Sequence, residues 1–282
     1  MQIKTNDLKF TYFPKAPNAK EALKGISLEI EQGSFVAFVG ETGSGKSTLM
    51  QCFNHLLIPS NGSIQIDDLT IRAKKRDRKI NKPLRKKVGF VFQFPEYQLF
   101  EETVLKDVCY GPKNFGFKEE EAIEKAKRAL DIMGIDESFY SRSPFELSGG
   151  EKKRVAIAGI LASEPDVIVF DEPTVGMDPI RRQIMIDLFD KLHADGKTII
   201  LVSHDMDLVL KSAEKVYVLQ DGLLKFEGKP YELFAQNDNY GIEAPKVMKF
   251  AKELNSHGYN LDLKNIKDVE SLVNEIGDKK NG

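Results

Sequence analysis

Residues 35–48 read FVAFVGETGSGKST, and this stretch decides the fold of the chain. Its first five residues, Phe35–Val39, are apolar and β-prone, as in a strand buried on both faces of a parallel sheet. The run leads directly into a loop with glycines at 40, 43 and 45. Glycine lets the backbone bend until several N–H groups converge on phosphate oxygens. A helix that begins near Lys46 would direct the positive end of its dipole at the same anion. The stretch therefore predicts an α/β fold with a phosphate-binding loop at a sheet edge.

The residues after the last glycine indicate which phosphate compound the loop binds. Lys46 can reach the β- and γ-phosphates of a nucleoside triphosphate, and the Ser47 hydroxyl can ligate Mg²⁺. A plain glycine-rich turn would not explain Lys-Ser-Thr at this position. We expect the nucleotide to be bound by the whole loop, which comprises Gly40, Glu41, Thr42, Gly43, Ser44, Gly45, Lys46, Ser47 and Thr48.

Two acidic residues follow a second apolar run. Val167–Phe170 is expected to form a buried strand that ends at Asp171, at the sheet edge where open parallel sheets bind ligands. Asp171 would then hold Mg²⁺ through water, and Glu172 would lie beside the γ-phosphate as a general base or a water-orienting group. The alternative is a strand that ends in two solvated acids. The phosphate-binding loop upstream favours the catalytic interpretation.

Ser148-Gly149-Gly150-Glu151, which we call the signature segment, predicts a helix start. Ser148 is a good N-cap, and Glu151 three residues later completes a capping box. A helix over residues 151–162 is expected to follow. Because the two glycines leave the first N–H groups uncovered, the same segment can bind an anion. A cap without a ligand is the alternative for this segment taken alone.

Composition limits the class of protein. The 282 residues carry 41 Lys and Arg against 43 Asp and Glu, a net charge of −2 that gives no reason to expect nucleic-acid binding. A hydrophobic content of 41% supports a packed core. Cys52 and Cys109 have no metal-binding spacing and fit a reduced cytosolic setting. No run is long and apolar enough to span a bilayer, and no secretory signal is expected, so any membrane role would come through a partner.

The remaining segments predict further strands and helices. Strands are expected at Ile3–Tyr12, Leu28–Ile30, Ile64–Ile66, Val88–Phe92, Thr198–Val202 and Val216–Leu219, and an amphipathic helix at Glu119–Met133. The helix that begins near Lys46 is expected to carry Leu49, Met50, Phe53 and Leu57 on its apolar side. The basic stretch 72–87, with Lys74, Lys75, Arg76, Arg78 and Lys79, is predicted to be a solvated loop, with an anion- or lipid-binding patch as the alternative. After Pro230 there are two helical stripes, Val247, Phe250, Ala251 and Leu254, then Val269, Leu272, Val273 and Ile276, which either pack on their own domain or form a subunit contact.

Taken together, GETGSGKST, Gln93, LSGGE, VIVFDEP, Gly176-Met177-Asp178 and His204 occur in the order found in one family. Over roughly residues 1–230 the chain resembles the nucleotide-binding subunit of ATP-binding cassette (ABC) transporters. The resemblance implies a P-loop NTPase (RecA-like) core with an antiparallel β subdomain at 1–92 and 160–230. It further implies an inserted helical subdomain at 93–159 that carries the signature segment, and a C-terminal helical extension at 231–282.

The resemblance also implies roles for individual residues. In that family two subunits enclose two ATP molecules, and the phosphate-binding loop of one faces the signature segment of the other, here Ser148, Gly149 and Gly150. Tyr12 would stack on adenine, and Gln93 would contact Mg²⁺ and the attacking water. His204 would hydrogen-bond the γ-phosphate. Asp178 would cross the dimer interface.

A narrower resemblance comes from QFPEYQLFEETV at 93–104 and VAIAG at 155–159, which are similar to energy-coupling factor (ECF) transporter ATPases, in particular the second of the two paralogues. Those proteins power import of vitamins, with a paralogous ATPase (a heterodimer, although a homodimer is possible), a transmembrane coupling protein and a membrane substrate-binding subunit. The expected location is peripheral, on the cytoplasmic face of the cell membrane. The alternatives are a dedicated cobalt or nickel importer and a non-transport ABC ATPase. The short interval between Gln93 and Ser148 argues against the latter.

Two regions near these motifs lead to further expectations. The acidic residues Glu96, Glu101 and Glu102, interspersed with the apolar Phe94, Tyr97, Leu99 and Phe100, would suit a basic amphipathic helix of the coupling protein, with an ordinary lobe boundary as the alternative. The signature segment ends in Glu151 where the family usually has Gln. A carboxylate there retains the capping function but repels the partner's phosphates, so a weakened composite site is expected. Met177 in place of the usual Leu is a mild change.

Overall fold

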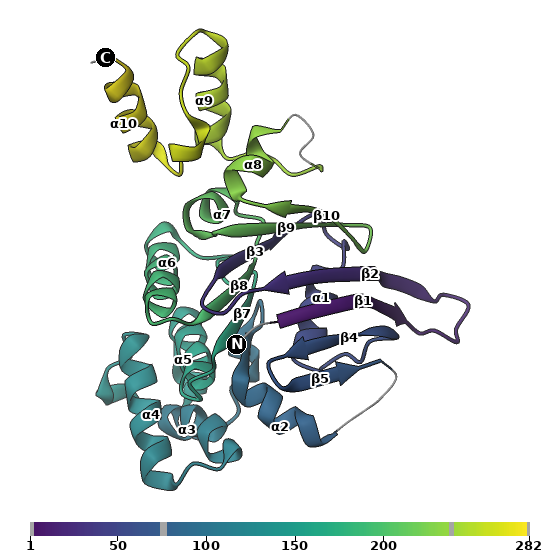
Figure 1. Ribbon diagram of the computed structural model, residues 1–282. Coiled ribbons are helices and arrows are strands. Elements are labelled where there is room, and N and C mark those ends of the chain that lie inside the picture. Colours follow the sequence, from purple (N-terminus) through teal and green to yellow (C-terminus); the bar gives the residue numbers. More distant parts are fainter. Residues whose placement is uncertain (1–2, 74–77, 237–239, 281–282) are drawn as a thin grey trace.

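The computed structural model describes residues 3–73, 78–236 and 240–280 and confirms the expected α/β class. Lys74, Lys75 and Arg76 of the basic stretch lie outside the described residues. Two sheets lie side by side, with helices on both faces of the larger one (Figure 1). Among the described residues, no helix combines the length and apolar character that crossing a membrane requires.

The larger sheet carries the expected buried strands. Its six strands lie in the order β10-β9-β3-β8-β7-β6. Their bounds are β3 Phe35–Val39, β6 Val88–Val91, β7 Val167–Asp171, β8 Thr198–Val202, β9 Lys215–Gln220 and β10 Leu223–Gly228. The five strands from β9 to β6 are parallel, and β10 is antiparallel to β9. Every residue of β3, β6, β7 and β8 is buried, because helices cover both faces. The carboxyl ends of β3, β7 and β8 therefore meet at one edge.

The smaller sheet is antiparallel, in the order β2-β1-β4-β5. Its strands are β1 Ile3–Tyr12, β2 Lys20–Ile30, β4 Asn61–Ile66 and β5 Leu69–Arg72. Strand β2 begins eight residues earlier than the Leu28–Ile30 strand expected from the sequence, because its polar first half pairs with the end of β1. The apolar side of this sheet packs on α1 (Lys46–Phe53) and on β3, which joins the two sheets into one core.

Three helices pack together at one end of the molecule: α3 (Val104–Phe115), α4 (Glu119–Ile132) and α5 (Gly149–Leu161). Their shared core continues without a break into β7 and β8. Short 3₁₀ turns connect them at Pro95–Gln98, Glu137–Phe139 and Pro144–Glu146.

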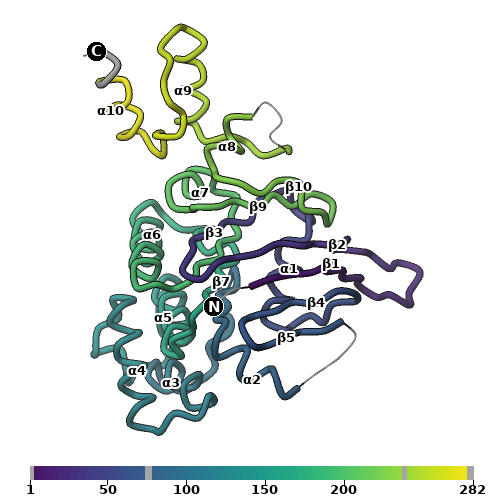
Figure 2. Tube along the Cα trace, viewed as in Figure 1, coloured from purple at the N-terminus to yellow at the C-terminus, as the bar shows by residue number. Residues whose placement is uncertain are grey.

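The C-terminal helices lie at the opposite end, beyond β9 and β10 (Figure 2). The remaining helices are α6 Pro179–Ala194, α7 Met206–Ser212, α8 Pro230–Ala235, α9 Lys246–Ser256 and α10 Val269–Lys280, with a 3₁₀ turn at Leu263–Asn265. Val247, Ala251 and Leu272 are buried against this end of the sheet. Phe250 is 51% exposed and Val269 is 69% exposed, so each stripe packs on its own domain with only part of its length.

Two local expectations were wrong. Residues 78–87 form helix α2 (Arg78–Lys87) rather than a loop, because Ile80 and Leu84, four residues apart, pack on the core beneath the smaller sheet. Helix α1 ends at Phe53, before Leu57, although Leu57 still packs on the core. The chain turns at His55, whose φ of +52° is incompatible with a continuing helix.

Candidate functional site

The phosphate-binding loop is held rigidly between strand β3 and helix α1. Gly40 and Gly45 have φ values of +140° and +106°. A side chain at Gly40 would collide with the carbonyl oxygen of Leu219, and one at Gly45 would lie 2.6 Å from the carbonyl oxygen of Ala22. Glycine is required at both positions for backbone conformation and for space. Strands β9 and β2 therefore fix the shape of the loop.

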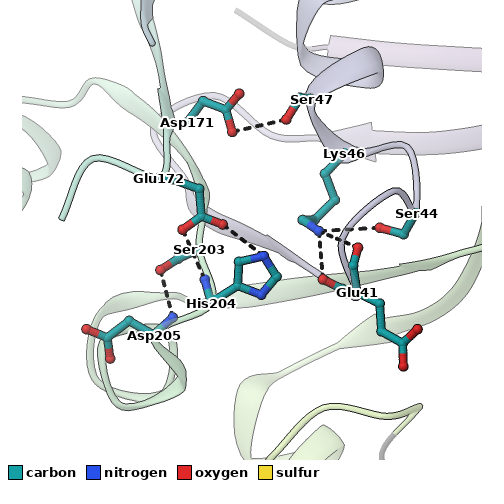
Figure 3. Close-up of polar contacts among 10 residues, drawn as sticks. Glu41, Ser44, Lys46, Ser47, Asp171, Glu172, Ser203, His204 and Asp205 are labelled. Atoms are coloured by element: carbon teal, nitrogen blue, oxygen red, sulfur yellow. Dashed lines mark hydrogen bonds and ion pairs between the residues drawn. The ribbon is translucent and has the colours of Figure 1, made fainter. Parts of the chain in front are cut away.

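The ammonium group of Lys46 lies inside this loop (Figure 3). Nζ donates hydrogen bonds to the carbonyl oxygens of Gly40 (2.6 Å) and Glu41 (2.9 Å) and to the Ser44 hydroxyl (3.4 Å). Burial lowers the pKa of Lys46, and the charges of Glu172 and Asp171 oppose that effect. The cation is thus held at the start of α1, within reach of a polyphosphate that binds to the loop.

Ser47 and Asp171 provide the oxygen pair expected for Mg²⁺. The Ser47 hydroxyl donates to Asp171 Oδ1 over 3.3 Å, so the first turn of α1 and the last residue of β7 are joined (Figure 3). Burial raises the pKa of Asp171, while the Ser47 hydrogen bond and Lys46 act in the opposite direction. Hydroxyl and carboxylate oxygens are ligands that Mg²⁺ prefers, usually with phosphate oxygens and water. The pair therefore fits this ion.

Glu172 lies where strand β7 has ended, in a strained backbone conformation with φ of +51°. The conformation is held because the Glu172 N–H donates to the Val202 carbonyl oxygen over 3.0 Å. Oε2 accepts a hydrogen bond from the His204 backbone N–H (3.3 Å). Oε1 is buried and accepts no hydrogen bond from any residue that the structure describes, although His204 Nε2 lies 3.3 Å from it. Burial raises the pKa of Glu172 to about 6.

His204 follows strand β8, and the residue after it, Asp205, is anchored by hydrogen bonds. Asp205, the next residue, caps helix α7 through the Leu208 N–H (3.1 Å) and accepts a hydrogen bond from Arg182 Nε (2.7 Å). The pKa of His204 is lowered by partial burial and by the charge of Lys46. The imidazole is therefore poised to be neutral at physiological pH and can donate one hydrogen bond and accept another.

These side chains line a common cavity of about 500 Å³. The predicted site residues that line it are Tyr12, Thr42, Gly43, Gly45, Lys46, Ser47, Thr48, Gln93, Asp171, Glu172 and His204. Sequence reasoning missed Lys20, Ala22, Val175 and Val202, which complete the lining. Lys20 reaches the cavity because it pairs with Tyr12 across β1 and β2, and nothing in its sequence context points to that.

Tyr12 is held at the side of the cavity. Its hydroxyl lies 3.0 Å from Thr48 Oγ1, and its ring meets Phe10 edge-on with centroids 4.8 Å apart. The ring is half-buried. The predicted adenine stacking remains a prediction for this residue.

The signature segment does not line this cavity. Ser148, Gly149 and Gly150 line a separate cleft of about 620 Å³, which also includes Phe94, Met177 and Ile184. The predicted capping box is confirmed, since the Ser148 N–H donates to Glu151 Oε2 (2.8 Å) and the Glu151 N–H to Ser148 Oγ (3.4 Å). Asp178, predicted to cross a dimer interface, caps α6 through the Arg181 N–H (2.9 Å). Within one chain, then, the signature segment and the phosphate-binding loop are apart.

The acidic and aromatic surface after Gln93 is largely exposed. Phe94 is 47% exposed, Tyr97 84% and Phe100 55%, whereas Leu99 is buried in the core and is not part of the surface. Tyr110 extends it, because its ring packs edge-on against Phe100 with centroids 4.9 Å apart. Sequence reasoning missed Tyr110, which lies on the next helix.

The comparisons with known proteins agree with this geometry. Residues 23–175 match the family model described as ABC transporter. The energy-coupling factor transporter ATP-binding protein EcfA2 of Streptococcus pneumoniae (serotype 2) is 49% identical over 92% of this chain and 93% of its own length. EcfA2 of Lactococcus lactis subsp. lactis is 48% identical over 91% of this chain and 90% of its own. The chain therefore belongs to the ABC transporter family, and within it to the energy-coupling factor transporter ATP-binding proteins.

Solved structures give the same result for the fold. CbiO1 of Clostridium perfringens, part of the ABC transporter complex cbiONQ, has a TM-score of 0.72 and 36% identity, over 89% of this chain and 98% of that one. The dimeric ATP-binding cassette MJ0796, in a post-hydrolysis state with ADP and Pi, has a TM-score of 0.72 and 33% identity, over 81% and 98%. The P-loop NTPase fold and the predicted resemblance to the second ECF paralogue are thus confirmed, and the chain is an ABC ATPase.

Proposed function

We propose that this chain is the ATP-binding and hydrolysing subunit that powers import by an energy-coupling factor transporter. The observation that carries the proposal is that the catalytic residues and the signature segment lie in two different cavities of the chain. Lys46, Ser47, Asp171, Glu172 and His204 converge on one cavity, while the signature segment lines another cleft of the same chain. Such a chain holds half of each of two ATP sites, and pairing with a second ATPase completes both.

In the first step, ATP binds to the phosphate-binding loop. Lys46 exchanges the carbonyl oxygens of Gly40 and Glu41 for the β- and γ-phosphate oxygens, and the N–H groups at the start of α1 bind the same anion. Ser47, Asp171 and Gln93 would hold Mg²⁺, which supplies positive charge that stabilises the transferring phosphoryl group. Tyr12 stacks on the adenine ring.

In the second step, Glu172 orients and deprotonates the attacking water. A carboxylate with a pKa of about 6 is ionised at neutral pH yet basic enough to accept a proton, which is the range a general base needs. Oε1 accepts no hydrogen bond from the described residues, so its lone pairs become available to the attacking water once His204 turns to the γ-phosphate. His204, within 3.3 Å of that oxygen, would hydrogen-bond the γ-phosphate.

The separation of the phosphate-binding loop from the signature segment implies a partner subunit. A paralogous ATPase pairs face to face with this chain, with a homodimer possible, and Asp178 contacts the partner across the interface. A transmembrane coupling protein places a basic amphipathic helix on the surface formed by Phe94, Tyr97 and Phe100, where Glu96 and Glu101 supply negative charge while Glu102 is paired with Lys106. The pair would lie on the cytoplasmic face of the membrane, and a membrane substrate-binding subunit would select the substrate, a vitamin.

A second candidate is the ATPase of a dedicated cobalt or nickel importer. The likeness to CbiO1, which is part of the ABC transporter complex cbiONQ, is the observation behind this candidate. Co-purification of the native transporter separates the two. Several different substrate-binding subunits with one ATPase pair support the shared vitamin module, and one constant membrane complex supports the dedicated importer.

Turnover in the paired ATPases tests the catalytic assignment. In a complex whose other site has been disabled, Glu172→Gln should retain ATP binding and lower the rate of phosphate release by a factor of about 100 or more, as loss of a general base does. Glu151→Gln is the matched control, because it makes the same chemical change in the signature segment, which contributes to the disabled site and not to the site under test. Normal turnover by the Glu172→Gln complex would remove Glu172 from its catalytic role.

A further inference from the structure

Arg181 connects the signature segment to the residues that follow Glu172. It lies in the first turn of α6 and lines the same cleft as the start of α5. Its guanidinium lies against Gly150, where a side-chain carbon would come within 2.9 Å of Cζ and 3.1 Å of Nε. Nε also lies 3.3 Å from Asp178 Oδ2. The side chain is 57% exposed, so solvent or a ligand can reach it despite the ion pair.

The signature segment of this chain carries a charge that opposes phosphate binding. The two hydrogen bonds of the capping box lower the pKa of Glu151, which keeps its carboxylate ionised at neutral pH. A negative charge in the first turn of α5 repels the phosphates that Ser148 and Gly149 would face. Glu151 alone would therefore reduce the affinity of this helix start for a partner's ATP.

Two other cations line the cleft, and the charge of one of them, Arg154, already lowers the pKa of Glu151, as does the charge of Arg142. Arg154 Nη1 donates to the carbonyl oxygens of Met133 (3.2 Å) and Gly134 (3.0 Å), at the far end of α4. Lys153 is only 8% exposed, and burial lowers its pKa. Arg181 differs from both because its charged group lies on a glycine of the signature segment itself.

We propose that Arg181 is an additional phosphate-binding residue of the composite ATP site, whose charge offsets that of Glu151. This inference rests on the proposed function, since the phosphate belongs to ATP held by the partner subunit. The contact with Asp178 holds the guanidinium beside Gly150 before the partner arrives, so little side-chain entropy is lost on binding.

ATP-dependent pairing of this chain with its paralogue tests the proposal, with the ATP concentration for half-maximal association as the readout. All variants carry Glu172→Gln to prevent hydrolysis. Arg181→Gln should raise that concentration about three-fold, as expected of one exposed charge near a phosphate. Arg181→Lys should keep the half-maximal ATP concentration close to that of the parent, and Glu151→Gln should lower it. The variant with both Arg181→Gln and Glu151→Gln should have a half-maximal concentration close to that of the parent. Lys225→Gln, an exposed cation on β10, is the matched control.

Salt distinguishes a charge effect from a structural one. The difference between Arg181→Gln and its parent should shrink between about 0.05 and 0.5 M salt, since exposed charges are screened over that range. Unchanged pairing by Arg181→Gln, or an Arg181→Lys variant as weak as Arg181→Gln, would overturn the proposal while leaving the proposed function intact. Absence of ATP-dependent pairing in the parent would overturn both.

Discussion

Removing the buried charge of Glu172 should stabilise the fold at the cost of catalysis. The side chain is 13% exposed, and burial raises its pKa from the ordinary 4.5 to about 6. Each pH unit of such an increase corresponds to about 1.4 kcal/mol, which gives an upper limit of about 2 kcal/mol. Because the carboxylate borders an open cavity, solvent screening reduces this to about 1 kcal/mol. Glu172→Gln should therefore raise the free energy of unfolding by about 1 kcal/mol at pH 8, or Tm by about 2–4 °C.

The sign of the pH dependence follows from the same pKa. The unfolded chain ionises Glu172 above about pH 4.5, whereas the folded protein does so only above about pH 6. The destabilisation is complete above the folded pKa and is lost as the pH falls toward 4.5. The advantage of Glu172→Gln should therefore fall to less than half between pH 8 and pH 5. The hydrogen bond from the His204 N–H favours the ionised form of Glu172, and its effect is already included in the pKa of about 6.

Thermal unfolding of the nucleotide-free chain at several pH values measures the effect. Glu151→Gln is again the control, because the capping box lowers the pKa of Glu151, so loss of that carboxylate should cost a few tenths of a kcal/mol rather than add stability. If Glu172→Gln melts below the native chain at pH 8, or if its gain is the same at every pH, the argument from burial is wrong.

Substitutions at two other residues, Lys46 and Ser148, test the phosphate-binding loop and the cap of α5. Lys46→Ala should lose most of the ATP affinity, because the loop is left without the cation that reaches the β- and γ-phosphates; unchanged affinity in equilibrium dialysis would remove the assignment of the phosphate-binding loop. Ser148→Ala should lower the free energy of unfolding by about 1 kcal/mol through loss of the N-cap of α5, whereas Ser148→Asp, which can still cap the helix, should keep most of it. Equal denaturant midpoints for the two Ser148 variants would contradict the capping role.

The features that the sequence predicted well are formed by residues close together in the chain. Phe35–Val39, the glycine loop and α1 are contiguous, and each glycine position follows from the backbone path that a phosphate requires. The capping box at Ser148 spans four residues and needs no tertiary information. The buried strand that ends at Asp171 could likewise be read from its apolar run.

What the sequence did not predict depends on contacts between distant residues. The polar first half of β2 is a strand only because β1 pairs with it. The sequence predicts a loop for α2 because most of its residues are charged or polar. The two apolar residues that anchor the helix, Ile80 and Leu84, form too short a pattern among the cations to indicate it. The packing of Tyr110 on Phe100 and of Arg181 on Gly150 joins different elements, and no periodicity in the sequence indicates either contact.

A cysteine crosslink between the two ATPases tests the shared ATP site most directly. Gly149 is suited to it, because a side chain there would meet no atom within 4 Å, and the native Cys52 and Cys109 are buried. Gly149→Cys is paired with a cysteine at the position of the paralogue's phosphate-binding loop that corresponds to Thr42. With ATP and Mg²⁺, in the hydrolysis-deficient Glu172→Gln background, a disulfide between the chains should form rapidly, and with ADP it should not. A crosslinking yield that is the same with ATP, with ADP and without nucleotide would contradict an ATP site shared between two subunits.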